Sequence, residues 1–201
     1  MMKQPTIKHS LQRSDYYRRC FALTDHDNNT SVAVQDKDQI IFRKPDENDG
    51  ADMYRLVKET NVLDVNSSYS YLMWGKYFNN TSIVAELNGK IVGFVAGFIQ
   101  PNTKDVLFVW QVGVSESQQG KGLASRLILE ILKRSACKQI QYLEATVTPS
   151  NEASKKLFSG LANKLNTDCR VFECFSKEQF PDDSHEAEMT YRIGPFNVTS
   201  N

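Results

Sequence analysis

A short glycine-rich segment, Gln118–Ala124 (QQGKGLA), has the composition of an anion-binding loop. It follows a nearly continuous apolar stretch, Val106–Val114, and runs into a segment with helical periodicity, Leu123–Ala136. Glycines let the main chain approach a phosphate group closely, and the free N–H groups at the start of a helix carry partial positive charge. The segment therefore predicts a pyrophosphate site, although a glycine pair before a helix also forms plain turns.

The elements that position this loop are predicted from turn signals and hydrophobic periodicity. Asn88 and Gly89 separate two of the strands and predict a two-residue hairpin turn of type I′. Strands are expected at Ile40–Arg43, Ser82–Leu87, Ile91–Gln100, Val106–Val114, Tyr142–Thr148, Arg170–Phe175 and Glu188–Ile193. Helices are expected at Pro45–Thr60, Ser67–Phe78, Leu123–Ala136 and Asn151–Lys164.

The chain has 201 residues, of which 40% are hydrophobic and 24% are charged. This composition is typical of a globular protein with a packed core and excludes disorder of the whole chain. Met1–Gln39 contains polar clusters with few branched apolar residues, so we expect a flexible N-terminal tail there. A single domain is then expected over residues 40–201.

Charge and cysteine content argue against several classes of protein. Lys plus Arg and Asp plus Glu each number 24, so the summed charge attracts neither nucleic acid nor an anionic membrane. No apolar run reaches the roughly 18 to 20 residues that span a bilayer, and the N-terminus has no signal-peptide pattern. The four cysteines lack metal-ligand spacing. We therefore expect free thiols, no metal site and a cytoplasmic location.

The order of these elements, together with Gln118–Ala124 and the later segment Asn151–Phe158 (NEASKKLF), resembles the GNAT acetyltransferase superfamily. The resemblance spans about Ile40–Phe196. It implies an α/β fold in which a mixed central sheet is flanked by helices and two parallel strands, Val106–Val114 and Tyr142–Thr148, splay apart. Acetyl-CoA is expected in the resulting wedge, where the amides of its pantetheine arm can satisfy unpaired main-chain groups.

The resemblance also implies which residues bind the cofactor. Main-chain groups of Val112 and Val114 are expected to hold the pantetheine arm, and Asn151 to reach it from the other side. Lys121 is either an additional phosphate contact or an ordinary surface lysine. The pyrophosphate is expected on the loop and helix start formed by Gln119, Gly120, Lys121, Gly122, Leu123 and Ala124.

Two positions depart from the superfamily pattern. Ser117 stands where the family has Gln or Arg, which matters little because main-chain groups bind the pyrophosphate. Phe158 stands where many members have a Tyr that is proposed to protonate the leaving thiolate. A phenylalanine donates no proton. Either another group or water must protonate the leaving thiolate, or the thiolate leaves without being protonated.

A narrower resemblance is to the L-2,4-diaminobutyrate acetyltransferases of ectoine biosynthesis. Four stretches carry it, namely Thr60–Leu72 (TNVLDVNSSYSYL), Phe108–Val112 (FVWQV), Leu143–Asn151 (LEATVTPSN) and His185–Pro195 (HEAEMTYRIGP). The resemblance implies acetyl transfer from acetyl-CoA to the γ-amino group of L-2,4-diaminobutyrate, whose product another enzyme cyclises to ectoine.

Such a substrate needs partners for its ammonium and carboxylate groups. Asp64 is the expected ammonium partner, and Tyr69 can offer a hydroxyl. Trp110 can wall the pocket, donate through its indole N–H or present its face to a cation. His185 is expected beside them on a C-terminal hairpin.

The substrate ammonium must lose a proton before its nitrogen attacks the thioester. Glu188 and Glu144 are the two candidate proton acceptors. Structural interpretations stay open beside these roles: Asp64 also suits a helix cap, Tyr69 and Trp110 suit a core, and the charged residues from His185 to Glu188 suit a solvated turn.

Two other functions remain open at this point. One is an acetyltransferase for a different small amine or amino acid, and the other is a module that binds acyl-CoA without catalysis. Dimers are common in the family and are the commonest symmetric assembly, so a homodimer is expected.

Overall fold

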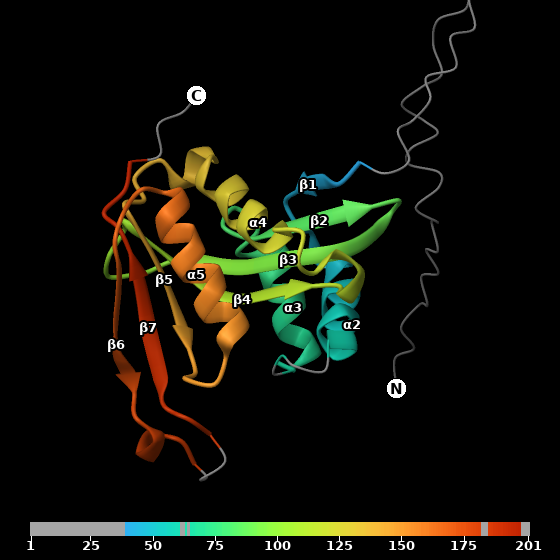
Figure 1. Ribbon diagram of the computed structural model, residues 1–201. Coiled ribbons are helices and arrows are strands. Elements are labelled where there is room, and N and C mark those ends of the chain that lie inside the picture. The colour runs from blue at the N-terminus through green and yellow to red at the C-terminus, as the bar shows by residue number, and fades with distance from the viewer. Residues whose placement is uncertain (1–38, 61–62, 64, 182–184, 198–201) are drawn as a thin grey trace, which may run out of the picture. The chain divides into compact units, whose positions relative to one another are not determined.

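Seven strands form one mixed sheet in the computed structural model of the protein, in the spatial order β1-β2-β3-β4-β5-β7-β6 (Figure 1). The structure describes residues 39–60, 63, 65–181 and 185–197. The tail expected over Met1–Gln39 therefore lies outside the described residues, apart from Gln39. None of the described helices is long and apolar enough to cross a membrane.

The strands and helices agree with the predicted elements to within a few residues. The strands are β1 (Ile41–Arg43), β2 (Ile83–Leu87), β3 (Lys90–Ile99), β4 (Val106–Val114), β5 (Tyr142–Val147), β6 (Cys169–Phe175) and β7 (Glu188–Ile193). The helices are α2 (Gly50–Thr60), α3 (Ser68–Lys76), α4 (Leu123–Leu132) and α5 (Glu152–Lys164). Short 3₁₀ segments are η1 (Glu47–Asp49), η2 (Glu116–Gln118), η3 (Ser135–Cys137) and η4 (Lys177–Gln179).

The turn between β2 and β3 is the predicted hairpin turn. Asn88 and Gly89 have φ angles of 52° and 75°. Positive φ at both central residues is what a type I′ turn requires, because it matches the right-handed twist of the flanking strands. The prediction for this turn is confirmed.

Two helix ends differ from the predicted elements. The helix expected from Pro45 begins at Gly50, after the 3₁₀ segment η1, and the helix expected to end at Ala136 ends at Leu132. Arg134 adopts an extended backbone conformation, and its guanidinium donates to the carbonyl oxygens of Asn79 and Ser82 at 3.2 and 2.5 Å. These bonds attach the chain to the segment before β2, so the helix ends early. Hydrophobic periodicity along one segment carries no sign of such a long-range contact.

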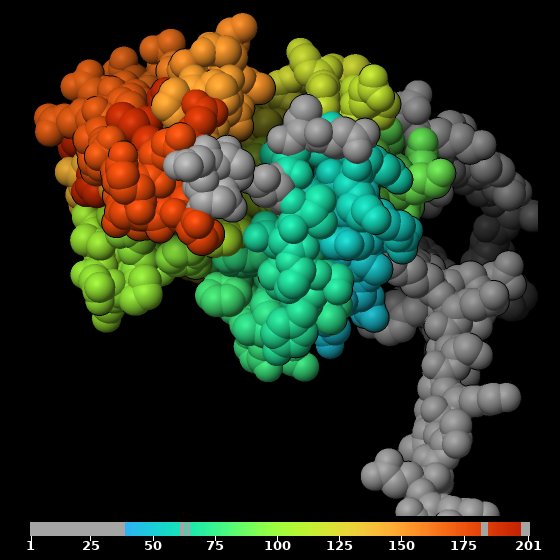
Figure 2. Space-filling model, turned by 90° about the horizontal axis from the view of Figure 1, so that it is seen from below, coloured from blue at the N-terminus to red at the C-terminus, as the bar shows by residue number. Residues whose placement is uncertain are grey.

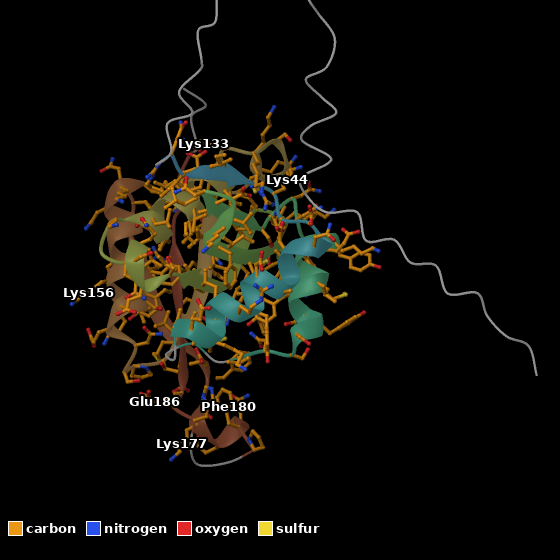
Figure 3. The ribbon with its side chains drawn as sticks, turned by 90° about the vertical axis from the view of Figure 1, so that its right-hand side faces the viewer. Lys44, Lys133, Lys156, Lys177, Phe180 and Glu186 are labelled. Atoms are coloured by element: carbon orange, nitrogen blue, oxygen red, sulfur yellow. The ribbon has the colours of Figure 1, made fainter. Side chains whose placement is uncertain are left out.

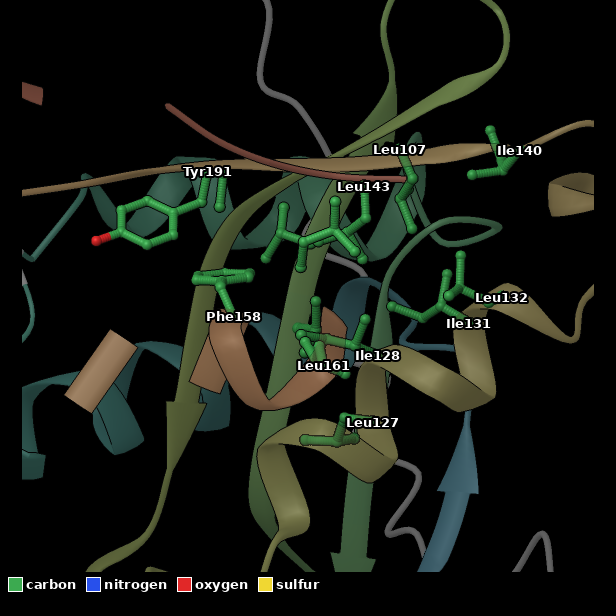
Figure 4. Packing of buried hydrophobic residues seen from close by; sticks show 14 of the residues in the cluster. Leu107, Leu127, Ile128, Ile131, Leu132, Ile140, Leu143, Phe158, Leu161 and Tyr191 are labelled. Atoms are coloured by element: carbon green, nitrogen blue, oxygen red, sulfur yellow. The ribbon is translucent and has the colours of Figure 1, made fainter. Parts of the chain in front are cut away.

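Helices cover both faces of the sheet, with α4 and α5 on one face and α2 and α3 on the other (Figure 1). Successive residues of a strand point to opposite faces, so Ile83 packs with the α4–α5 side and Val84 with the α2–α3 side. Figure 4 shows part of the larger cluster, in which Leu127 and Ile128 of α4 and Phe158 of α5 pack against the strands. β4 thus packs against α4 on one face and α2 on the other.

Candidate active site

β4 and β5 are parallel neighbours that pair at one end only. The paired residues are Val106 with Tyr142, Leu107 with Leu143 and Phe108 with Glu144. Beyond Phe108, β4 continues to Val114 paired with β3, and β5 continues to Val147 paired with β7. The facing edges of β4 and β5 therefore diverge toward their C-terminal ends, and the predicted wedge is confirmed.

A bulge in β4 accompanies this divergence. Ala96 of β3 is opposite Gln111 and the next residue, Gly97, is opposite Val109, so Trp110 is the extra residue of β4. Bulges bend a strand and redirect its side chains. Trp110 is 52% exposed even though β4 lies in the middle of the sheet.

A cavity of about 780 Å³, here called the cofactor cavity, opens between the end of β4 and the first turns of α4 and α5. Eight of the nine residues expected to bind the cofactor line it, namely Val112, Val114, Gln119, Gly120, Gly122, Leu123, Ala124 and Asn151. The ninth, Lys121, is exposed and is not among the lining residues. Its position favours the surface-lysine interpretation.

The glycine loop presents main-chain N–H groups to this cavity. Gly120 and Gly122 have φ angles of 72° and 74°, in the left-handed region that favours glycine. Gly122 is the N-cap of α4 and has no side chain with which to accept the free N–H groups of the first turn. Those groups are left for an anion, and the helix dipole adds favourable charge.

The start of α5 lines the same cavity. The Oδ1 atom of Asn151 accepts the main-chain N–H of Ser154 at 3.0 Å, so Asn151 is the N-cap of α5. Glu152, an acidic residue of this turn, pairs with Lys155 at 2.5 Å, and that hydrogen bond lowers the pKa of Glu152. Two helix N-termini thus meet at one cavity. The N-terminus of α5 is capped by Asn151, so the uncapped first turn of α4 is the site that fits the diphosphate of a coenzyme A molecule.

A second cavity of about 330 Å³, here called the amine cavity, lies between β4 and β5. It adjoins the cofactor cavity, because five residues line both, namely Leu63, Val112, Thr148, Asn151 and Ser154. Figure 2 shows the α2–α3 segment, in cyan and teal, and the C-terminal segment, in orange and red, on the same face of the molecule. The two cavities therefore lie next to each other where β4 and β5 diverge.

Three of the predicted substrate and catalytic residues line the amine cavity together, namely Trp110, His185 and Glu188. His185 and Glu188 belong to the segment that leads into β7, and Trp110 reaches the cavity from β4. Tyr69 is 67% exposed on α3 and is not among the lining residues of either cavity. Asp64 lies outside the described residues, directly after Leu63.

Glu144 has a different environment from that expected of a proton acceptor. Its carboxylate forms an ion pair with Arg192 and accepts a hydrogen bond from the Gln100 amide at 2.6 Å. It lies on the part of β5 that is still paired with β4, and it is not among the residues lining the amine cavity. Because the strands have not yet diverged there, the geometry gives Glu144 a structural ion pair rather than access to substrate.

Phe158 lines the amine cavity from α5 and is buried. Its ring centroid lies 6.3 Å from that of Tyr191, at an interplanar angle of 40°. Phe158 therefore faces the amine cavity but cannot donate a proton, as the tyrosine found at this position in many family members is proposed to do.

A polar pair beside the amine cavity was not predicted from the sequence. Gln111 lines the cavity and is buried, and the hydroxyl of the buried Tyr71 donates to its Oε1 atom at 3.1 Å. Burial raises the pKa of Tyr71, so this hydroxyl keeps its proton. The available signal was a single amide side chain within the otherwise apolar stretch Val106–Val114.

Comparison with known proteins agrees with this geometry. The model of the acetyltransferase (GNAT) family matches residues 50–161. The L-2,4-diaminobutyric acid acetyltransferase of Marinococcus halophilus is 56% identical over 159 residues, which cover 79% of this chain and 92% of that protein. The enzyme of the same name from Halalkalibacterium halodurans is 53% identical over 79% of this chain and 83% of its own length.

A solved structure is similar as well. Diaminobutyrate acetyltransferase EctA from Paenibacillus lautus, in complex with L-2,4-diaminobutyric acid and coenzyme A, aligns with a TM-score of 0.76 and 38% identity. The alignment covers 82% of this chain and 99% of that structure. The chain therefore belongs to the GNAT acetyltransferase family and, within it, to the L-2,4-diaminobutyric acid acetyltransferases.

Proposed function

We propose that this protein transfers the acetyl group of acetyl-CoA to the γ-amino nitrogen of L-2,4-diaminobutyrate. The observation that carries the proposal is that the cofactor and amine cavities adjoin at the wedge and share five lining residues. One cavity offers helix N-termini to a diphosphate, and the other offers carboxylate, imidazole and indole groups to a cationic amine. The names of the relatives and of the solved complex support the same reaction.

Acetyl-CoA supplies an acetyl group that is activated as a thioester. The first turn of α4 would bind its diphosphate, and the main chain of Val112 and Val114 would face its pantetheine amides. Asn151 and Ser154 line both cavities, so they would flank the arm where it enters the amine cavity.

Glu188 is our candidate for the proton acceptor. A carboxylate that lines the amine cavity is suited to take a proton from the substrate ammonium, either directly or through water. Trp110 and His185 would bind the rest of the substrate, with Asp64 and Tyr69 as the expected contacts from the α2–α3 side. Glu144 is not retained as a base, because its carboxylate pairs with Arg192.

Departure of the thiolate needs no tyrosine in this site. The side chains of Thr148, Asn151 and Ser154 line the junction of the two cavities and carry hydrogen-bond donors. A donor at the junction would stabilise the negative charge on sulfur, although Phe158 offers none.

The test is to identify, by NMR of the product, which nitrogen of diaminobutyrate is acetylated. Acetylation of the γ-nitrogen, with faster turnover than of putrescine or ornithine, supports the proposal. Acetylation of the α-nitrogen, or preference for either competitor, contradicts it, and so does coenzyme A binding without thiol release. Glu188→Gln should lower kcat by a factor of about 100 or more, whereas Glu144→Gln should mainly lower thermal stability.

We further propose that the protein is a homodimer that associates through β6. This strand is at the edge of the sheet, and its Val171, Phe172 and Phe175 side chains are 49%, 48% and 46% exposed. An exposed apolar edge strand is suited to pair with a second copy of itself. Light scattering after gel filtration should give twice the chain mass of 22.9 kDa, and Phe172→Asp should halve it. A monomeric wild-type protein would contradict the assignment.

The cytoplasm is the location that we infer for the reaction. Acetyl-CoA is available there, and the described cysteines Cys137, Cys169 and Cys174 are free thiols, as expected in a reducing compartment. The product is expected to serve ectoine biosynthesis, in line with the family resemblance.

A further inference from the structure

Glu186 joins the segment before β7 to the loop before α5. Its Oε2 atom accepts the main-chain N–H of Ser150 at 3.2 Å, and its Oε1 atom accepts the Ser150 hydroxyl. Figure 3 shows Glu186 and Phe180 at the lower end of the molecule. One carboxylate thus contacts both polar hydrogens of a single residue on another element.

The two ends of this contact belong to different parts of the active site. Ser150 lines the cofactor cavity, and its neighbour Asn151 lines both cavities. On the other side, His185 and Glu188 flank Glu186 in the chain and line the amine cavity. The carboxylate therefore links the cofactor loop to the segment that carries the candidate base.

Further contacts fix both partners of this link. The Lys155 ammonium donates to the carbonyl of Pro149 at 3.0 Å, which holds the loop from the α5 side. The carbonyl of Glu186 lies 2.7 Å from Nδ1 of His185. Because a carbonyl only accepts hydrogen bonds, Nδ1 carries the hydrogen, and the neutral ring then has Nε2 as its acceptor. The His185 ring also stacks on the Phe180 ring, with 3.8 Å between the two ring centroids.

The charge of Glu186 suits this place. Ser150 directly precedes Asn151, the N-cap of a helix of 13 residues, and a carboxylate is favourable near a helix N-terminus. A neutral side chain of similar size would keep part of the hydrogen bonding and lose the charge. Glu186→Gln therefore tests the contribution of the charge, whereas Glu186→Ala removes the charge, the hydrogen bonds and the packing together.

We propose that Glu186 is a positioning residue that couples the two cavities, holding His185 and Glu188 in register with the loop that contacts coenzyme A. The proposal rests on the proposed function of the two cavities. Its consequence is reciprocal: if coenzyme A orders the loop, the amine binds more tightly, and the amine in turn strengthens coenzyme A binding by the same factor.

The test measures amine affinity by titration calorimetry with and without saturating coenzyme A. In the wild-type protein we expect coenzyme A to tighten amine binding about tenfold. Glu186→Ala should reduce this gain to less than threefold. Because the coupling is reciprocal, the gain in coenzyme A affinity that saturating amine produces should fall to the same value. Glu186→Gln should show a larger gain in amine affinity from coenzyme A than Glu186→Ala, and a smaller one than the wild type. The exposed Glu178 of η4 provides the matched control, and Glu178→Ala should behave as the wild type.

A double-mutant cycle with Ser150→Ala completes the test. If the two side chains act through one contact, the double variant should lose no more than Glu186→Ala alone. Additive losses, or a Glu186→Ala variant that keeps the full gain from coenzyme A, would overturn the proposal. The gain is measured with whichever amine the wild-type protein acetylates fastest, so an error in the proposed substrate leaves this test intact. Should Glu186→Ala not fold, Glu186→Gln and Ser150→Ala carry the comparison.

Discussion

The hydroxyl of Tyr71 on α3 donates to the carboxamide oxygen of Gln111 on β4 across 3.1 Å. Tyr71 is fully buried, and Gln111 lines the amine cavity one residue after the bulge at Trp110. The bond fixes which end of the Gln111 amide is oriented toward the helix. A helix on one face of the sheet thereby sets the orientation of a polar group in the wedge.

Removing the Tyr71 hydroxyl should weaken the use of the amine. For Tyr71→Phe we expect kcat/KM for diaminobutyrate to fall about five- to tenfold, because a buried hydrogen bond contributes about 1 kcal/mol. The KM of acetyl-CoA should change less than twofold. Steady-state kinetics with each substrate varied in turn measure both values. Equal effects on the two substrates would mean that Tyr71 acts only through general stability.

The same residue makes stability sensitive to alkaline pH. Burial raises the pKa of Tyr71 above its ordinary value of 10.0. Since the folded state then holds this proton more tightly than the unfolded state, the free energy of unfolding should fall as pH rises above about 10. Urea denaturation between pH 8 and 11 should give a smaller fall for Tyr71→Phe than for the wild type. Parallel curves for the two proteins would contradict this account.

Gly120→Val should weaken coenzyme A binding by a factor of ten or more. A β-branched residue is strained at the φ of 72° observed there, so the loop must change shape and its N–H groups lose their alignment. Gly89 offers a matched control, because its φ of 75° is similar and it lies in the β2–β3 hairpin. Gly89→Val should lower thermal stability and leave the dissociation constant of coenzyme A unchanged. Equal affinities for Gly120→Val and wild type would count against the diphosphate site.

Asp64→Ala should raise the KM of the amine at least tenfold and the KM of acetyl-CoA less than twofold. The expected reason is the loss of a carboxylate partner for the substrate ammonium. Leu63, which precedes Asp64, lines both cavities. Comparable increases in both KM values, together with a lower melting temperature, would instead support a helix-capping role.

Arg43→Met should destabilise the fold by about 3 kcal/mol. Arg43 donates to both carboxylate oxygens of the fully buried Asp49, at 2.6 and 2.9 Å, and the substitution removes these bonds. Calorimetry should record a melting temperature lower by roughly 6 to 12 °C. The control is Arg55→Met, which breaks an exposed pair with Asp52 and should cost less than about 0.5 kcal/mol. A loss of the same size in both variants would refute the importance of burial.

The sequence by itself determined the order of strands and helices, the Asn88–Gly89 turn and the glycine loop. These features depend on neighbours in the chain: alternating apolar residues define strands, and a positive φ selects glycine at Gly120 and Gly122. Family motifs extended this local information to the wedge and to most residues that line the cofactor cavity. Local sequence patterns did not predict the end of α4. The helix ends at Leu132, before its apolar pattern ends, because Arg134 donates a hydrogen bond to the carbonyl of Ser82.

Tertiary structure alone decided which carboxylates face the amine cavity. Glu144 and Glu188 are both acidic residues on adjacent strands, and no local pattern separates them. Glu144 lies where β4 and β5 still pair and is held by Arg192, whereas Glu188 lies where the strands have diverged. Whether a side chain lies before or after the point where β4 and β5 diverge depends on strand pairing between residues far apart in the chain. Local sequence patterns do not determine this pairing. The same holds for the contacts of Tyr71 with Gln111 and of Glu186 with Ser150, each of which joins residues at least 36 positions apart.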